Sequence, residues 1–153
     1  MSEIEARNAA DAHEEAEILI VDDDEDFVRA MRRVLRSWGF ASRFALSGAE
    51  ALQLCALRSP KIALVDVMMP EMDGWQLSEA LAQRPDPPAV ILVSGSFKAP
   101  ELHASSTIVA TLPKPVRNSI LRELLTRRLE GPGPGASAEA MGPRREAPEV
   151  PGE

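Results

Sequence analysis

The segment Lys61-Ile-Ala-Leu-Val-Asp-Val-Met-Met-Pro-Glu-Met-Asp-Gly74 joins a wholly apolar run to a loop that contains Pro70 and Gly74. The run Ile62–Val65 does not alternate with polar residues, which is typical of a strand covered on both faces in a parallel sheet. Asp66 follows directly, and open parallel sheets bind ligands at the carboxyl ends of their strands. The segment therefore predicts a central buried strand. We expect Asp66 at the mouth of the sheet, as a surface residue rather than part of the core, and as the first candidate for chemistry.

Four more apolar runs predict further strands, at Glu17–Val21, Ser42–Leu46, Ala89–Val93 and Thr107–Leu112. Residues at helical spacing lie between these runs and after the last of them, and they predict intervening helices. The segment Phe97–Ser106 is weakly patterned and predicts at most a short helix. Strands that alternate with helices indicate an α/β fold, a doubly wound five-stranded parallel sheet with right-handed crossovers.

The helix after the first strand is predicted to be amphipathic. Its apolar positions recur at helical spacing, at Phe27, Met31, Val34, Leu35 and Trp38. Its other faces carry four arginines, at Arg29, Arg32, Arg33 and Arg36. We expect the apolar face in the core and the basic exterior to be a candidate docking face.

Chemically active side chains follow four of the predicted strands: Asp22 and Asp23, then Asp66, then Ser94, then Lys114. Because the carboxyl ends of parallel strands meet at one edge, these groups should converge. Carboxylates hold a hard cation and a lysine offsets phosphate charge, so the set predicts a site for a divalent cation and a phosphoryl group. The bland alternatives are that the acids only cap a helix and that Ser94 is an ordinary loop residue. Five consecutive acids, Asp22 to Asp26, exceed what a cap requires, and a cation would relieve their repulsion.

The length of 153 residues and the 44% hydrophobic content suffice for one sizeable domain. The net charge of −7 comes mainly from the ends, because residues 1–16 carry five acids and one base, and residues 131–153 carry four acids and two bases. Neither end has apolar runs, and the second is rich in Pro and Gly. We expect a flexible leader over 1–16, one domain over 17–130 and a disordered tail over 131–153.

Several functions are disfavoured by the same composition. Residues 17–130 hold 15 acids and 14 bases without a basic stripe, so direct nucleic-acid binding is not expected. Apolar runs are far shorter than the roughly 20 residues that span a bilayer, and the N-terminus has no signal-like block, so we expect a cytoplasmic protein without membrane insertion. The single Cys55 lies among leucines and alanines, which favours helix packing over a redox role.

Four motifs, taken in order, resemble those of the receiver domain of bacterial response regulators. They are Ile18-Leu-Ile-Val-Asp-Asp-Asp24, Asp66-Val-Met-Met-Pro-Glu-Met-Asp-Gly74, Val93-Ser-Gly95 and Leu112-Pro-Lys-Pro115. The resemblance covers residues 17–130, and it is the combination that is specific. It implies strand order 2-1-3-4-5 and phosphorylation on aspartate by a histidine kinase or a histidine phosphotransfer protein.

The resemblance also implies a role for each matching residue. Asp66 is the implied phosphoacceptor, and Mg²⁺ would be held by Asp23, Asp66 and the main-chain carbonyl of Met68, with Asp22 acting through water. Ser94 takes the role of the switch hydroxyl, and Lys114 pairs with the phosphoryl oxygens. The chain would then be a phosphoacceptor that assists its own Mg²⁺-dependent phosphorylation and dephosphorylation, and not an enzyme in the ordinary sense.

Two features depart from the family's pattern. The family usually has an aromatic residue three positions before the lysine, where this chain has Thr111, and the helix between Ser94 and the last strand is shortened or irregular. The site is therefore expected to be complete while the usual readout surface is altered. We expect a stand-alone receiver that signals through protein contacts with an unknown downstream protein. The alternatives are a docking module that phosphorylation does not regulate and, third, a Mg²⁺-dependent phosphohydrolase, which Met68 disfavours because it stands where a second catalytic acid is needed.

Overall fold

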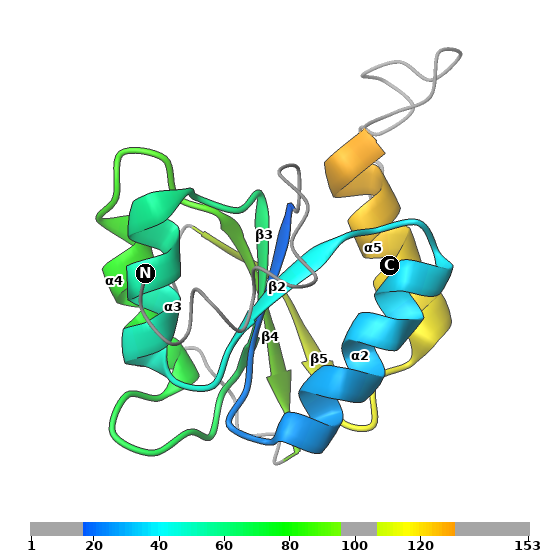
Figure 1. The fold of residues 1–153 in the computed structure, drawn as a ribbon, viewed down its shortest axis with the longest axis horizontal. Coiled ribbons are helices and arrows are strands. Elements are labelled where there is room, and N and C mark those ends of the chain that lie inside the picture. Colours follow the sequence, from blue (N-terminus) through cyan, green and yellow to red (C-terminus); the bar gives the residue numbers. More distant parts are fainter. Residues whose placement is uncertain (1–16, 96–106, 131–153) are drawn as a thin grey trace, which may run out of the picture.

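The structure, a computed structural model, describes residues 17–95 and 107–130 (Figure 1). These residues form one parallel sheet in the order β2-β1-β3-β4-β5. The strands are β1 (Ile18–Val21), β2 (Ser42–Ala45), β3 (Ile62–Asp66), β4 (Ala89–Ser94) and β5 (Ile108–Pro113). The helices are α2 (Glu25–Ser37), α3 (Gly48–Leu57), α4 (Gly74–Ala82) and α5 (Asn118–Glu130). The predicted doubly wound fold and its strand order are confirmed.

Helices cover both faces of the sheet, with α3 and α4 on one side and α2 and α5 on the other (Figure 1). Alternate residues of each central strand therefore enter different cores. In β1, Leu19 and Val21 pack with the α3–α4 layer, whereas Ile18 and Ile20 pack with the α2–α5 layer. This double coverage explains the continuous apolar runs, because no strand face of β1 or β3 is left to solvent.

Helix α2 is amphipathic as predicted, but the centre of its buried stripe differs. Val28, Met31 and Leu35 are buried, and they recur at the spacing of one helical face. Phe27 and Trp38, which the sequence pattern places in the core, are only half-buried at the edges of that stripe. Helix α2 is thus rotated so that Phe27 lies toward the carboxyl edge of the sheet rather than beneath it.

Several predictions fall on residues that the structure does not describe. They concern the leader 1–16, the tail 131–153 and the shortened helix within 97–106. In the described ranges, none of the helices combines the length and the apolar character that crossing a membrane requires. Cys55 is buried in the α3–α4 layer, where it acts as a small apolar side chain.

Candidate functional site

Two acidic loops meet at the carboxyl edge of the sheet because β1 and β3 are parallel neighbours. Val21 pairs with Val65, so Asp22 and Asp66 emerge side by side. Carboxylate oxygens of Asp22, Asp23 and Asp66 all lie within 4.8 Å of one another. The structure therefore brings together the three acids that the sequence analysis proposed as one group.

The acidic run Asp22–Asp26 divides into two tasks. Asp24 caps α2, since its Oδ1 accepts hydrogen bonds from the main-chain N–H groups of Asp26 at 3.0 Å and Phe27 at 3.2 Å. Asp22 is 1% exposed, and its Oδ1 accepts from the N–H of Asp24 at 2.9 Å. Capping thus explains Asp24, while the exposed Asp23 and the buried Asp22 face the site.

Lys114 reaches the acids from the end of β5. Its main-chain N–H donates to the carbonyl of Ser94 at 2.8 Å, which continues the β4–β5 ladder by one bond. Its Nζ donates to Oδ2 of Asp22 at 2.9 Å and lies 3.5 Å from Oδ1 of Asp66. Burial opposes the charge on Lys114, but the hydrogen bond and negative charge of Asp22, aided by Asp66, raise the pKa of its ammonium group above the ordinary value.

Asp66 stands at the mouth of the sheet, as predicted, but the prediction that it is a surface residue is wrong. It is 6% exposed, because it is still the last residue of β3 and the loop after it folds over it. Burial, followed by the charge of Asp22, raises the pKa of Asp66 to about 6, although Lys114 and a main-chain hydrogen bond from Met68 act in the opposite direction. Burial therefore favours the protonated form of Asp66.

Gly74 lets the loop after β3 close tightly. Its N–H donates to the carbonyl of Val67 at 2.9 Å, and a Cβ at position 74 would lie 2.6 Å from the carbonyl oxygen of Asp66 and 2.9 Å from the Cα of Val67. Helix α4 begins there with Asp73 as its cap, in a reciprocal pair of hydrogen bonds with Gln76. A glycine is needed because the contacted atoms are main chain and cannot move aside.

Ser94 is the last residue of β4 and is 4% exposed. The preceding residue, Val93, pairs with Asp66 in the register of β3 and β4, so Ser94 is one step beyond the acceptor aspartate. Thr111 lies within β5, half-buried, and pairs with Leu92. The hydroxyl candidate is therefore at the predicted edge, and the position that is usually aromatic carries a small side chain in the sheet.

One residue of the site was not proposed from the sequence. The ring centroid of Phe27 lies 4.4 Å from Nζ of Lys114, within the range of a cation–π contact. An aromatic residue near the start of an amphipathic helix gives no local signal for this role, because the same pattern favours a core position. Phe27 contacts Lys114 because the rotation of α2 about its axis places this ring at the edge of the sheet and not in the core.

The sequence profile of the response regulator receiver domain matches residues 18–126 of this chain. The chain belongs to the response regulator receiver family. Response regulator MprA of Mycobacterium sp. (strain KMS) is 33% identical over 131 residues, which cover 81% of this chain and 56% of that protein. The probable transcriptional regulator ycf27 of Cyanophora paradoxa is 32% identical over 120 residues, covering 75% of this chain and 50% of that protein. The receiver chain thus spans about half the length of these curated relatives.

Solved structures of similar fold agree with this assignment. The signal receiver domain of a histidine kinase from Syntrophus aciditrophicus is 27% identical with a TM-score of 0.67, covering 80% of this chain and 96% of that one. A sensor protein from Polaromonas sp. JS666 is 31% identical, also with a TM-score of 0.67, over 74% of this chain and 94% of that one. Receiver domains use acidic residues to hold Mg²⁺, and the three clustered carboxylates offer the oxygen ligands that this ion prefers.

Proposed function

We propose that this receiver accepts a phosphoryl group on Asp66 from a histidine kinase or a histidine phosphotransfer protein. The observation that carries the proposal is the position of Asp66, which is buried beside two further carboxylates and 3.5 Å from Nζ of Lys114. A carboxylate in this setting has the nucleophilic oxygen, the screening cation and the acidic ligands that acyl phosphate formation needs.

The reaction joins two anions, so charge screening decides whether it proceeds. An Oδ of Asp66 attacks the phosphorus of a phosphohistidine; the P–N bond breaks and its electron pair stays on the imidazole nitrogen. Mg²⁺ would be held by Asp23, Asp66 and the main-chain carbonyl of Met68, with Asp22 acting through water, and it would supply Lewis-acid neutralisation of the phosphoryl oxygens. Lys114 contributes a second positive charge at the same oxygens, because its Nζ already lies 3.5 Å from Oδ1 of Asp66.

Phosphorylation also changes which contacts are favourable at the edge of the sheet. Asp66 gains charge and three acceptor oxygens, so the hydroxyl of Ser94 gains a partner and the ammonium of Lys114 gains a stronger one than Asp22. Ser94 and Lys114 are linked by the hydrogen bond between their main chains. We infer that Ser94 and the adjoining Gly95 respond to the new charge, and that the response does not include the burial of a ring at position 111, since Thr111 has none.

The two other readings make different chemical demands on the same site. A docking module without regulated phosphorylation has no need for Lys114 between two buried acids. A phosphohydrolase needs an acid two positions after its nucleophile, and that position is Met68, whose side chain is 66% exposed. Neither reading is favoured by a specific contact among the described residues.

The chemical nature of the product tests the proposal. The protein is incubated with Mg²⁺ and acetyl phosphate, then treated with borohydride, which reduces an acyl phosphate but leaves a phosphoserine intact. Peptide mapping should find the reduced product at Asp66 and nowhere else. Modification at Ser94, at Asp22 or at no aspartate would overturn the assignment of the acceptor.

A further inference from the structure

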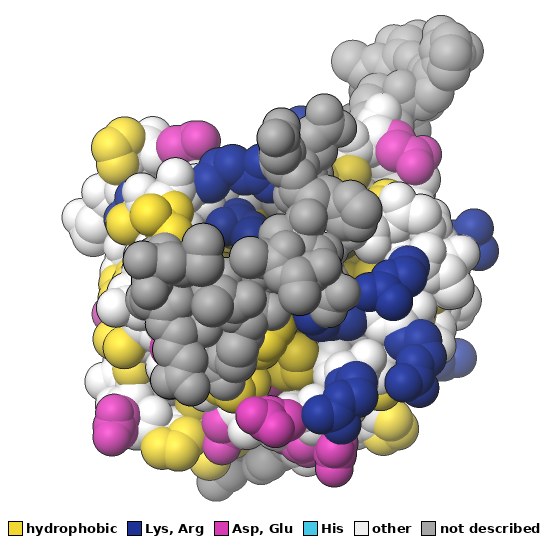
Figure 2. Space-filling view, in the orientation of Figure 1, with side chains coloured by type: hydrophobic (Ala, Val, Ile, Leu, Met, Phe, Trp, Pro, Cys, Tyr) yellow, Lys and Arg dark blue, Asp and Glu magenta, His cyan; other side chains and the backbone are white. Residues whose placement is uncertain are grey.

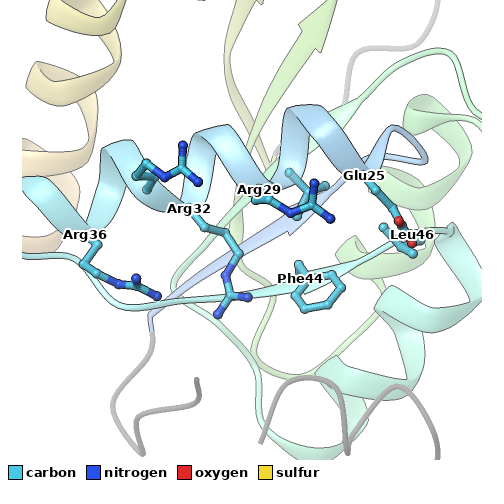
Figure 3. A pocket seen from close by; sticks show the side chains of 8 residues that line it. Glu25, Arg29, Arg32, Arg36, Phe44 and Leu46 are labelled. Atoms are coloured by element: carbon cyan, nitrogen blue, oxygen red, sulfur yellow. The ribbon is translucent and has the colours of Figure 1, made fainter. Parts of the chain in front are cut away.

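A groove with a volume of about 440 Å³ runs between α2 and β2, away from the phosphoacceptor site. Four arginines of α2 line it, Arg29, Arg32, Arg33 and Arg36. In Figure 3 the side chains of Arg32 and Arg36 extend toward β2. Phe44 and Leu46 line it from the β2 side. We call this feature the arginine groove.

The arginine groove has a fixed apolar part. The guanidinium of Arg32 lies 5.0 Å from the ring centroid of Phe44, and its NH2 donates to the carbonyl of Ser42 at 3.2 Å. Arg32 is therefore held on the strand, and it covers one side of the Phe44 ring. A partner side chain that entered the groove would meet a preformed wall of Arg32, Phe44 and Leu46 rather than a mobile one.

The two outer arginines remain able to bind an anion. Arg36 is exposed in the last turn of α2. Arg29 pairs with Asp26 at 3.3 Å, but the two side chains are 64% and 93% exposed, so this pair contributes little and can exchange. Positions 29, 32 and 36 follow one helical face and span about 10 Å at 1.5 Å per residue.

This spacing decides among the anions that arginines bind. A single phosphate needs guanidinium groups that converge on one point, whereas these are spread along a line. A nucleic-acid backbone would extend past the groove toward Glu25 and the acids at the edge of the sheet, which would repel it. In Figure 2 basic side chains gather over α2, and acidic side chains mark the lower edge where the strands end.

We propose that the arginine groove binds an acidic amphipathic helix of a partner protein. Carboxylates at positions i, i+3 and i+7 of such a helix repeat at the spacing of Arg29, Arg32 and Arg36. An apolar side chain between them would contact Phe44 and Leu46. Glu25 at one end of the groove sets the direction in which the partner helix binds, because it favours a basic residue of the partner at that end.

The probe for this proposal is a synthetic helix-forming peptide with Glu at i, i+3 and i+7 and Leu between them. Its matched control replaces every Glu with Gln. Chemical shifts of backbone amides in the full-length, unphosphorylated protein report where each peptide binds. The Glu peptide should shift residues of α2 and β2, and its affinity should fall at least about five-fold when salt is raised from about 50 to about 500 mM.

Charge-reversal variants separate the groove from general electrostatics. Arg29→Glu combined with Arg36→Glu should weaken binding of the Glu peptide at least ten-fold (about 1.4 kcal/mol). Arg127→Glu combined with Arg128→Glu makes the same charge change on exposed residues of α5, and it also removes one surface ion pair, Arg127 with Glu123. This control should change the affinity less than two-fold, with both proteins keeping the wild-type circular dichroism.

Three results would overturn the proposal: equal binding of the Gln peptide, equal loss in the α5 control, or shifts that map outside α2 and β2. A third variant tests an occupant from the same chain. If changing Asp11, Glu14 and Glu15 to their amides in the full-length protein tightened peptide binding ten-fold or more, the groove would belong to the chain's own leader and not to a partner. Unchanged affinity in that variant supports the partner helix. Because phosphorylation is absent from this assay, its outcome is independent of the function proposed for Asp66.

Discussion

Lys114 donates the hydrogen bond of its Nζ to Asp22, at 2.9 Å, and not to the proposed phosphoacceptor, Asp66, which is 3.5 Å away. The lysine thus neutralises the more deeply buried acid and screens the other across a short gap. The charge of Lys114 stabilises the two neighbouring carboxylates against their mutual repulsion. The lysine is also close enough to bind a phosphoryl group on Asp66.

Removing that lysine should destabilise the protein as well as impair phosphorylation. In Lys114→Ala two buried acids lose their common counter-charge, and we expect the free energy of unfolding at pH 8 to fall by about 1–2 kcal/mol, a value reduced because the lysine side chain is partly exposed. Urea unfolding measures this loss. The exposed Lys61→Ala, whose pairing with Glu17 is 3.8 Å long, is the control and should change stability by less than about 0.5 kcal/mol. Equal stability of Lys114→Ala and the wild type would contradict the screening role.

The raised pKa of Asp66 predicts how the stability of the metal-free protein depends on pH. The folded pKa of about 6 is above the ordinary 3.8, so the folded state binds more protons, and the contribution of Asp66 to stability falls as pH rises from about 4 through about 6. The amide in Asp66→Asn does not titrate, so this variant keeps the same stability contribution as pH rises. It should therefore be more stable than the wild type by about 3 kcal/mol at pH 8, and the difference should shrink toward pH 4. A difference that grows as pH falls would show that the sign is wrong.

Phe27 should affect the lysine without contributing much to the core. Phe27→Leu keeps an apolar side chain but removes the ring face that lies 4.4 Å from Nζ of Lys114. We expect a several-fold slower phosphorylation by acetyl phosphate and a stability change below about 1 kcal/mol. Phe40→Leu, at another half-buried aromatic position beside α2, is the matched variant and should leave the rate unchanged. Equal phosphorylation rates in all three proteins would show that Phe27 has no role in the site.

Gly74 tests the close approach of α4 to the acceptor strand. In Gly74→Ala the new Cβ meets the carbonyl oxygen of Asp66 and the Cα of Val67, so the helix start or the end of β3 must shift. A melting experiment should show a loss of about 1–3 kcal/mol, the usual cost of overpacking. Gly95→Ala adds the same group where no atom of the described residues lies within 4 Å, and it should be nearly neutral. If both substitutions were tolerated equally, tight closure of the loop would not be required.

The sheet and most of the site are predictable because they follow from local patterns. Continuous apolar runs indicate strands covered on both faces, and parallel strands place the residues after them at one edge, so the sequence alone predicts that Asp22, Asp66 and Lys114 lie close together. The strand order and the roles of individual residues needed the resemblance to receivers, since spacing alone does not order strands. The roles of Asp66, Ser94 and Lys114 stay predictions until phosphorylation is measured.

Other features depend on how elements rotate and close, which periodicity does not specify. Val28 belongs to the buried stripe of α2, whereas its larger neighbour Phe27 is only half-buried. Arg43, between Ser42 and Phe44 in β2, is 8% exposed and donates to carbonyls at the end of α3, at Leu54 and Arg58. The sequence around a buried arginine gives no signal that its side chain will donate hydrogen bonds to the end of a helix in another layer.

The most direct test of the proposed function is intact mass measurement after incubation with acetyl phosphate, with and without Mg²⁺. The wild type should gain one phosphoryl group only with Mg²⁺. Asp66→Asn and Asp23→Asn should gain none, while Asp24→Asn, which keeps a helix cap outside the site, should be labelled as the wild type is. Equal labelling of the wild type and Asp66→Asn, or labelling that does not depend on Mg²⁺, would contradict the account.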